Sequence, residues 1–140
     1  MHRKDQGKLG ESLVISQCLE QGVEVFTDFG DNSKIDLILN TSSRGLVRVQ
    51  VKCPGREKTS PSSAKLYLTK SGSGYKFKYT QDHVDFFAVV DLATKRIAWI
   101  EATKEVVSRQ SILLRIDPLE HSKTNSLVSW FNEYEVFPFL

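Results

Sequence analysis

The sequence has few cysteines and histidines and lacks the motifs of several common enzyme classes. Its 140 residues include two cysteines and three histidines. Cys18 and Cys53 are too few for a disulfide framework or a zinc knuckle, and the scattered histidines form no zinc-binding pair. The chain also has no phosphate-binding glycine loop and no Gly-x-Ser-x-Gly elbow. These absences disfavour disulfide-rich, zinc-binding, nucleotide-binding and serine-hydrolase proteins.

Long apolar runs are missing as well. No run approaches the ~20 residues needed to cross a bilayer. The polar start, Met1-His2-Arg3-Lys4, is not a signal peptide. With 40% hydrophobic and 26% charged residues, the composition is that of an ordinary soluble globular protein with one domain, residues 1–140. We therefore expect a protein of the reducing cytoplasm that has no membrane partner.

Acidic residues are nearly absent from one segment of the chain. Between residues 44 and 79, nine basic residues stand against a single acidic one, Glu57, so the segment carries a net charge of +8. The whole chain carries only +2, which leaves −6 for the rest. A segment of one sign inside a balanced chain predicts a polyanionic partner, and nucleic acid is favoured over a merely solubilising surface. The basic residues are Arg44, Arg48, Lys52, Arg56, Lys58, Lys65, Lys70, Lys76 and Lys78.

Two short apolar runs predict a β-hairpin with polar side chains on one face. Residues 35–40 and 46–52 flank a short polar turn. Side chains alternate between the two faces of a strand, so Gln50 and Lys52 share one face while the valines take the other. Asp36 lies within the first apolar run, where a buried carboxylate needs a partner or a metal. A hairpin with one solvated face is the simpler alternative.

A first helix is predicted over residues 4–21, where apolar residues recur at helical spacing. Glu11 lies beside the apolar stripe of this helix, because the residues three, four and seven positions later are apolar. Taken alone, Glu11 is most simply an edge carboxylate paired with a lysine. Together with Asp36, Gln50 and Lys52, it completes a set of groups suited to Mg²⁺-dependent hydrolysis of a phosphate ester.

The rest of the chain predicts a mixed α/β (α+β) domain with a central mixed β-sheet flanked by helices. Further strands are expected at residues 23–26, 65–69, 75–79, 85–91, 96–100 and 112–116. Residues 65–69 and 75–79 flank a glycine- and serine-rich tip and are expected to form a hairpin. A short helix capped by Thr103 and an amphipathic helix over residues 125–133 are also expected. The apolar tail, residues 136–140, is expected to fold back on the core or to form an oligomer interface.

One family resemblance brings these residues together. Asp36 followed by Gln50-Val51-Lys52 resembles the Asp…(Asp/Glu)-x-Lys signature of the PD-(D/E)XK nuclease superfamily, and Glu11 stands at the corresponding place on the first helix. Within the superfamily, the chain most resembles the homing endonucleases of cyanobacterial group I introns and, more distantly, the archaeal Holliday junction resolvases. The likeness implies a restriction-endonuclease-like core and hydrolysis of DNA with Mg²⁺, for which Mn²⁺ can substitute.

The resemblance also implies roles for particular residues. Glu11, Asp36 and the Val51 carbonyl would bind the metal, and Lys52 would be the active-site lysine. Gln50 would replace the Asp or Glu of the signature, which removes one negative charge from the site. DNA contacts are expected from the basic segment, with Arg56 and Lys58 nearest the site. The predicted DNA-binding residues are Arg48, Arg56, Lys58, Lys65, Lys70, Lys76 and Lys78.

The function expected from these features is a site-specific DNA endonuclease of the intron-homing type, which breaks both strands of double-stranded DNA. One domain carries one such site, so a double-strand break requires a homodimer at least, and the resemblance allows a tetramer. Two alternatives stay open. One is a Holliday junction or repair nuclease of the same superfamily, and the other is a non-catalytic DNA-binding module in which Gln50 marks a lost site.

Overall fold

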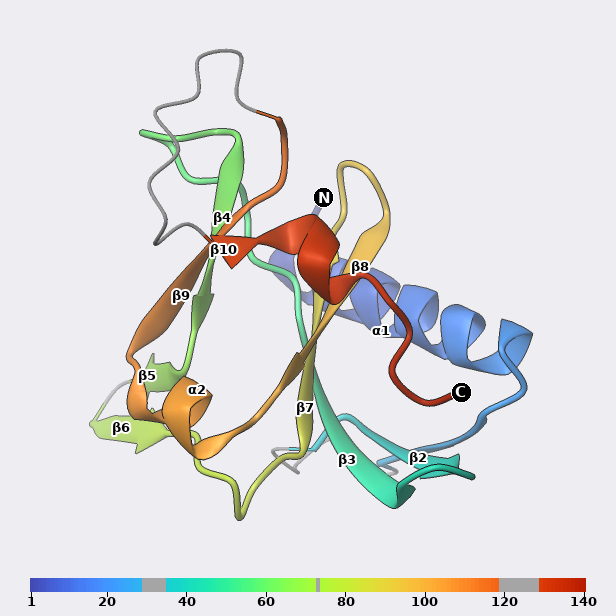
Figure 1. Ribbon diagram of the computed structural model, residues 1–140. Coiled ribbons are helices and arrows are strands. Elements are labelled where there is room, and N and C mark those ends of the chain that lie inside the picture. The colour runs from blue at the N-terminus through green and yellow to red at the C-terminus, as the bar shows by residue number, and fades with distance from the viewer. Residues whose placement is uncertain (29–34, 73, 119–128) are drawn as a thin grey trace.

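A five-stranded mixed β-sheet forms the centre of the molecule in the computed structural model, which describes residues 1–28, 35–72, 74–118 and 129–140 (Figure 1). In spatial order its strands are β1 (Glu24–Thr27), β2 (Leu37–Thr41), β3 (Gly45–Lys52), β7 (Phe86–Asp91) and β8 (Arg96–Glu101). The β3–β7 pair is parallel, and the other pairs are antiparallel. The predicted mixed central sheet is confirmed, and so is the hairpin formed by β2 and β3.

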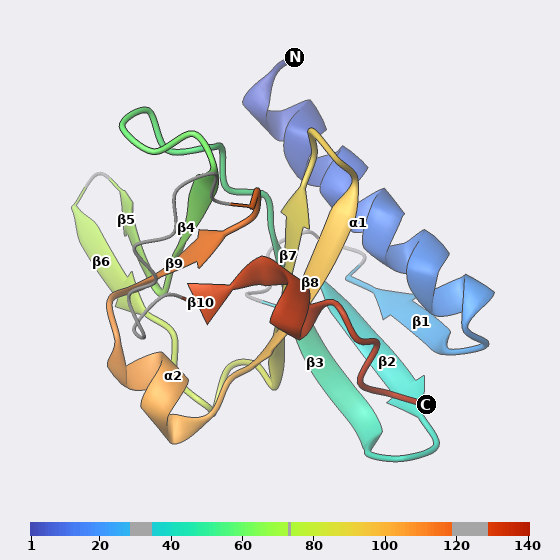
Figure 2. The same ribbon diagram turned by 45° about the horizontal axis from the view of Figure 1, so that its top comes forward.

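Helix α1 (Arg3–Glu20) covers one face of this sheet (Figure 2). The His2 side chain accepts a hydrogen bond from the Lys4 N–H and caps the start of the helix, and Gly22, with a φ of 77°, follows its end. Val14 and Cys18 are buried against apolar side chains of the sheet. The helix predicted over residues 4–21 is confirmed. No helix within the described ranges is long and apolar enough to cross a membrane.

Gly10 allows α1 to lie close to the residues that follow β3. A Cβ atom at this position would lie 2.0 Å from the Cys53 Sγ and 3.7 Å from a methyl carbon of Val51. Because packed atoms do not approach so closely, a larger residue fits only if Cys53 moves. Gly7, by contrast, has nothing within 4 Å of the same added atom. The contact at Gly10 therefore sets how near the helix lies to the hairpin.

Replacing Gly10 with alanine is expected to lower the free energy of unfolding by about 1–3 kcal/mol, because the added methyl group overpacks the contact with Cys53. Gly7→Ala is the matched control and should raise that free energy by about 0.5–1 kcal/mol, since alanine is the better helix former. Urea unfolding measures both. Adding Cys53→Ala should restore most of the stability lost in Gly10→Ala, and a Gly10→Ala protein as stable as the wild type would contradict this packing.

A second, three-stranded sheet packs against β7 and β8 on the other face of the central sheet (Figure 2). It consists of β4 (Ser63–Tyr67), β9 (Ser111–Arg115) and β10 (Ser129–Trp130), accompanied by helix α2 (Lys104–Ser108) and the 3₁₀ helix η1 (Phe131–Tyr134). Leu66, Leu114 and Phe131 pack there in one buried cluster with Phe87 and Ile100 of the central sheet. A separate hairpin is formed by β5 (Thr69–Gly72) and β6 (Tyr75–Lys78).

Two predicted elements differ from the structure. The hairpin expected between residues 65–69 and 75–79 is wrong for residues 65–67, which belong to β4 and pair with β9. It is confirmed for residue 69, which belongs to β5 and pairs with Lys78 of β6. Leu66 is buried in the apolar cluster under the second sheet, which favours pairing of residues 65–67 with β9. The helix expected over residues 125–133 is wrong at residues 129–133, where β10 pairs with β9 and a 3₁₀ turn follows. Residues 125–128 lie outside the described residues.

The apolar tail folds back on the central sheet. The Phe139 ring is buried, with its centroid 5.0 Å from that of Phe86 and 5.2 Å from that of Trp99, and Phe137 lies 5.6 Å from Trp99. These aromatic contacts lie on the face that α1 also covers. The first alternative for the tail is therefore confirmed. The second alternative, an oligomer interface built from the tail, stays a prediction, and Val136 and Leu140 of the tail are exposed.

Candidate active site

Asp36 is fixed at the entrance to β2 by two hydrogen bonds to the facing strand. Its N–H donates to the Val49 carbonyl at 2.9 Å, and its carboxylate accepts the Val51 N–H, also at 2.9 Å. These two bonds join Asp36 to Val49 and Val51, the residues on either side of Gln50. The carboxylate predicted to bind metal is therefore held in a defined orientation at the end of the hairpin where β3 runs toward Lys52.

Gln50 has an unusual side-chain environment. Its neighbours Val49 and Val51 are buried in the core under α1, so alternation directs Gln50 and Lys52 to the opposite face of β3. Among the described residues, the Gln50 Oε1 is buried and has no hydrogen-bond partner. A buried acceptor left in this way costs about 1–3 kcal/mol. In native proteins such an atom is commonly satisfied by an ordered water or a bound ion.

Lys52 lies over an aromatic ring and beside an open groove. Its Nζ is 4.6 Å from the centroid of the Tyr79 ring. The groove has a volume of about 530 Å³, and Arg3 and Gln6 of α1 and Tyr67 of β4 contribute to its walls. The predicted active-site lysine is therefore accessible from a hollow that the first helix and the second sheet border together.

Glu11 and Asp36 both act on Cys53, the residue that follows Lys52. Burial raises the pKa of the Cys53 thiol to about 11, and the negative charges of Glu11 and Asp36 add to this shift. Cys53 is therefore a neutral thiol at physiological pH. The same shift shows that the two carboxylates, one from the helix and one from the hairpin, lie within electrostatic reach of one point at the end of β3.

Asp28 is a further acidic residue near this region, and the sequence interpretation missed it. It lines an open groove together with Glu11 and Ser12 of α1. It also lines a neighbouring hollow beside Asp36 and Ile35. Asp28 follows β1 directly, and no periodic pattern distinguishes it from an ordinary turn residue. Only the fold brings it between the two predicted metal-binding carboxylates.

The donor atoms at this end of the hairpin fit a hard divalent cation. In the part of the chain that the structure describes, no three Asp, Glu, His or Cys side chains gather closely enough to hold a metal. A site with three or more such side chains is therefore not present among these residues. The oriented Asp36 carboxylate and the unsatisfied Gln50 amide oxygen are both oxygen donors. Mg²⁺ commonly binds through one or two carboxylates and keeps several waters, so this set is suited to it.

The structure gives two of the predicted DNA-binding arginines intramolecular partners. The Arg48 guanidinium donates to both carboxylate oxygens of Asp85 and to the carbonyls of Gln81 and Asp82. This hydrogen bonding, together with the charge of Arg48, lowers the pKa of Asp85. Arg48 therefore ties β3 to the segment that leads into β7. DNA binding by Arg48 stays a prediction.

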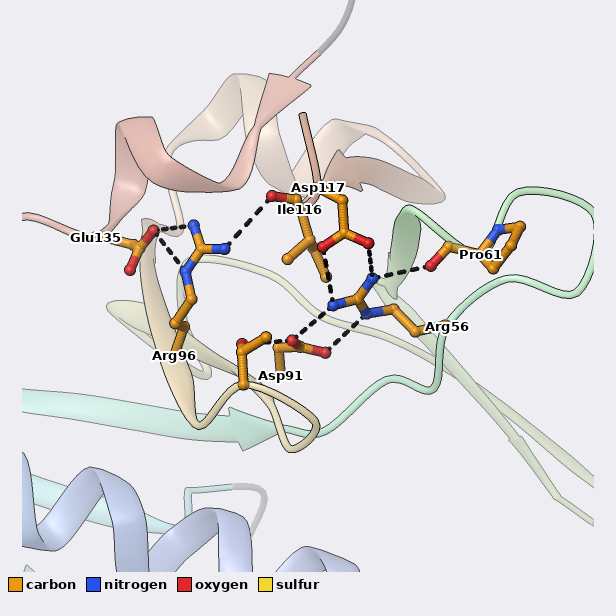
Figure 3. Close-up of polar contacts among 8 residues, drawn as sticks. Arg56, Pro61, Asp91, Arg96, Ile116, Asp117 and Glu135 are labelled. Carbon is orange, nitrogen blue, oxygen red and sulfur yellow. Dashed lines mark hydrogen bonds and ion pairs between the residues drawn. The ribbon is translucent and has the colours of Figure 1, made fainter. Parts of the chain in front are cut away.

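Arg56 lies at the centre of a second ion-pair network (Figure 3). Its guanidinium forms two hydrogen bonds of 2.9 Å to the Asp91 carboxylate, and it also donates to Asp117 at 2.9 Å and to the Pro61 carbonyl at 2.8 Å. Asp91 is only 3% exposed. The network joins the loop after β3 to the ends of β7 and β9. Arg56 therefore forms a bridge between the two sheets, and the expected DNA contact of Arg56 near the site stays a prediction.

The predicted DNA-binding lysines differ in their surroundings. Lys58 and Lys76 are exposed. Lys65 lies 3.6 Å from the Glu57 carboxylate, and the Lys78 Nζ donates to the Arg109 carbonyl at 2.6 Å. The remaining one, Lys70, belongs to β5. Contact of these five lysines with DNA stays a prediction.

The hairpin with its leading aspartate, the Gln-x-Lys run at the end of β3 and the glutamate on the first helix together have the layout of a PD-(D/E)XK nuclease. The sequence matches the PD-(D/E)XK endonuclease family over residues 1–137, and the chain belongs to this family. The predicted superfamily is confirmed, and with it the nuclease class.

One solved structure shows the same fold. The chain is similar to a bacterial homing endonuclease, I-Ssp6803I, with a TM-score of 0.73 and 19% sequence identity, over 89% of this chain and 83% of that one. At this identity the likeness establishes the fold. No curated protein shows significant sequence similarity to the chain.

Proposed function

We propose that the protein is a site-specific DNA endonuclease of the homing type, which hydrolyses phosphodiester bonds with a divalent metal and breaks both strands. One observation carries the metal-dependent part of this proposal: the buried Gln50 Oε1 has no partner in the described part of the chain. Gln50 lies in β3 between the two residues to which Asp36 is hydrogen-bonded, Val49 and Val51. The homing character is supported by the name of the structural neighbour, a bacterial homing endonuclease. The proposal therefore combines a site that can take a cation with a fold used for cutting DNA.

The residues of the site would have distinct roles. Asp36, Gln50 and the Val51 carbonyl would hold Mg²⁺ or Mn²⁺, and Glu11 would complete the set directly or through water. A bound cation would neutralise charge on the scissile phosphate and lower the pKa of a water molecule. The Val51 N–H keeps the Asp36 carboxylate in place. The Lys52 ammonium would stabilise the negative charge that develops on the phosphate in the transition state.

Double-strand cleavage by this chain requires more than one copy. One domain contributes one Asp36–Lys52 site, so a homodimer at least would place two sites on the two strands, and a tetramer would satisfy the same requirement. The basic segment would position the duplex through phosphate contacts. Light scattering on the purified protein, alone and with duplex DNA, measures the number of copies.

Cleavage of a random-duplex library with fragment-end sequencing tests the proposed function. With Mg²⁺ or Mn²⁺ we expect fragments that end at one long recurrent sequence and carry 5′-phosphates, and EDTA should abolish them. Preferential cutting of four-way junctions would favour the junction or repair nuclease instead. Tight duplex binding without cleavage in either metal would leave the non-catalytic DNA-binding module as the function.

A further inference from the structure

The ring of Tyr79 forms the surface on which the Lys52 ammonium lies. The Lys52 Nζ is 4.6 Å from the ring centroid, within the range in which the negative face of an aromatic ring attracts a cation. Tyr79 follows β6 in the chain, so the contact joins two segments that are distant in the sequence.

Tyr79 is held rigidly by its surroundings. It is 2% exposed, and its ring makes edge-to-face contacts with Phe77 and Phe87, with centroid distances of 5.0 Å and 5.4 Å. Its backbone N–H donates to the Leu68 carbonyl at 3.0 Å. Backbone and ring are therefore both fixed, which makes Tyr79 a firm support rather than a mobile surface residue.

A lysine needs such a support if it is to act in catalysis. Its side chain has four rotatable bonds and loses up to about 2 kcal/mol of rotamer entropy when it is held in one place. Catalytic groups work when they are positioned before the reaction, not during it. The face of a fixed aromatic ring can hold an ammonium group while its N–H bonds still point to other partners.

We propose that Tyr79 is a positioning residue for Lys52: its fixed ring holds the ammonium at the end of β3, where the scissile phosphate would lie. The assignment of a phosphate to Lys52 rests on the proposed function, whereas the contact between ammonium and ring is a property of the protein without DNA. The ring face supplies the contact, so a phenylalanine at position 79 would serve, and an aliphatic residue would not.

The position of the Lys52 side chain can be measured directly by nuclear magnetic resonance. Protons above an aromatic ring are shifted upfield, so in the free wild-type protein the Lys52 Hε resonances, assigned by their loss in Lys52→Met, should lie upfield of those of exposed lysines. The shift should persist in Tyr79→Phe and vanish in Tyr79→Leu. A wild-type protein whose Lys52 Hε resonances match those of exposed lysines would overturn the proposal, even if no variant folds.

Cleavage kinetics test the consequence for the reaction. In Tyr79→Leu we expect the single-turnover cleavage rate to fall about ten-fold with unchanged DNA affinity, and in Tyr79→Phe the rate should stay within about two-fold of wild type. Phe131→Leu is the matched control, because it removes a fully buried ring of the same cluster other than the two that hold Tyr79. Equal rate losses in Tyr79→Leu and Phe131→Leu would show a merely structural role and overturn the proposal. A wild-type protein that cuts no duplex would instead refute the proposed function and leave the resonance test intact.

Discussion

Replacing Lys52 with methionine is expected to reduce the rate of DNA cleavage about 10³-fold, with little change in DNA affinity or in the free energy of unfolding. Methionine keeps most of the length of the side chain and removes only its charge. In the proposed reaction, that charge stabilises the phosphate in the transition state, so the loss should fall on the single-turnover rate rather than on binding. Quench-flow or gel assays with excess enzyme measure this rate.

Lys104→Met supplies the matched control for Lys52→Met. Lys104 is an exposed residue at the first position of α2, and it has no part in the site or in the predicted DNA surface. Its replacement is expected to leave the cleavage rate within about two-fold of wild type. If the two variants cleaved DNA at the same rate, Lys52 would not be the active-site lysine.

The Arg56→Met variant is expected to lose about 3–5 kcal/mol of folding free energy, because the buried Asp91 carboxylate loses its charged partner. Asp91 is 3% exposed and receives two hydrogen bonds from Arg56. After the substitution, the Asp91 carboxylate keeps the hydrogen bond of 2.6 Å that the Thr94 hydroxyl donates to it. The side chain of methionine can fill the space but cannot replace the guanidinium. Equilibrium urea unfolding measures the loss.

An exposed ion pair provides the comparison for Arg56→Met. Arg109 pairs with Glu105 on the surface of α2, where the two side chains are 49% and 80% exposed. Arg109→Met should therefore cost no more than about 0.5 kcal/mol. If the two variants lost similar free energies of unfolding, the ion pair between Arg56 and Asp91 would contribute no more than an exposed ion pair. That result would contradict the expectation drawn from the burial of Asp91.

Acid is expected to lower the free energy of unfolding through the Asp91 carboxylate. Burial raises the pKa of Asp91, but the hydrogen bonds from Arg56 and Thr94 outweigh this effect and hold that pKa below its usual value. A carboxyl whose pKa is lower in the folded state stabilises the fold above its unfolded pKa, about 4, and this stabilisation is lost as the pH falls through the folded value. The urea midpoint of the wild type should therefore drop below about pH 4.

The Arg56→Met variant should respond differently to acid. Without Arg56, burial dominates, so the Asp91 pKa rises and protonation no longer costs stability. The difference in unfolding free energy between wild type and Arg56→Met is therefore expected to shrink as the pH is lowered from 7 to about 3. A difference that stayed constant over this range would show that Asp91 is not the group left unpaired.

The candidate site was predictable from the sequence because its signals are local. An alternating strand, an aspartate inside an apolar run and a helix with regular apolar spacing each depend on a few neighbouring residues. The β2–β3 hairpin and α1 were therefore correctly predicted. The contact that joins them was not, since nothing near Gly10 in the sequence shows that Cys53 will press against it.

The misinterpreted elements depended on partners distant in the sequence. The sequence shows Arg56 only as one of a run of basic residues, because its partners, Asp91 of β7 and Asp117 after β9, lie far along the chain. DNA binding by Arg56 stays a prediction. The apolar pattern around Leu66 indicates a strand but not its partner, which is β9 and not the strand that follows next in the sequence. Charge and periodicity identify which side chains need partners, whereas the fold decides which partners they receive.

The parallel pairing of β3 with β7 sets apart a long segment of the chain between the two strands. Two parallel strands cannot be joined by a tight turn, so the chain leaves the central sheet after Lys52 and returns only at Phe86. Most of the basic segment lies between these two residues, whereas Glu11, Asp36 and Gln50 precede it. Under the proposed function, exposed basic residues such as Lys58 and Lys76 would be replaceable, with altered DNA contacts and an unchanged hairpin. Arg56 and Tyr79 of the same segment would not be, because the first joins the two sheets and the second contacts Lys52.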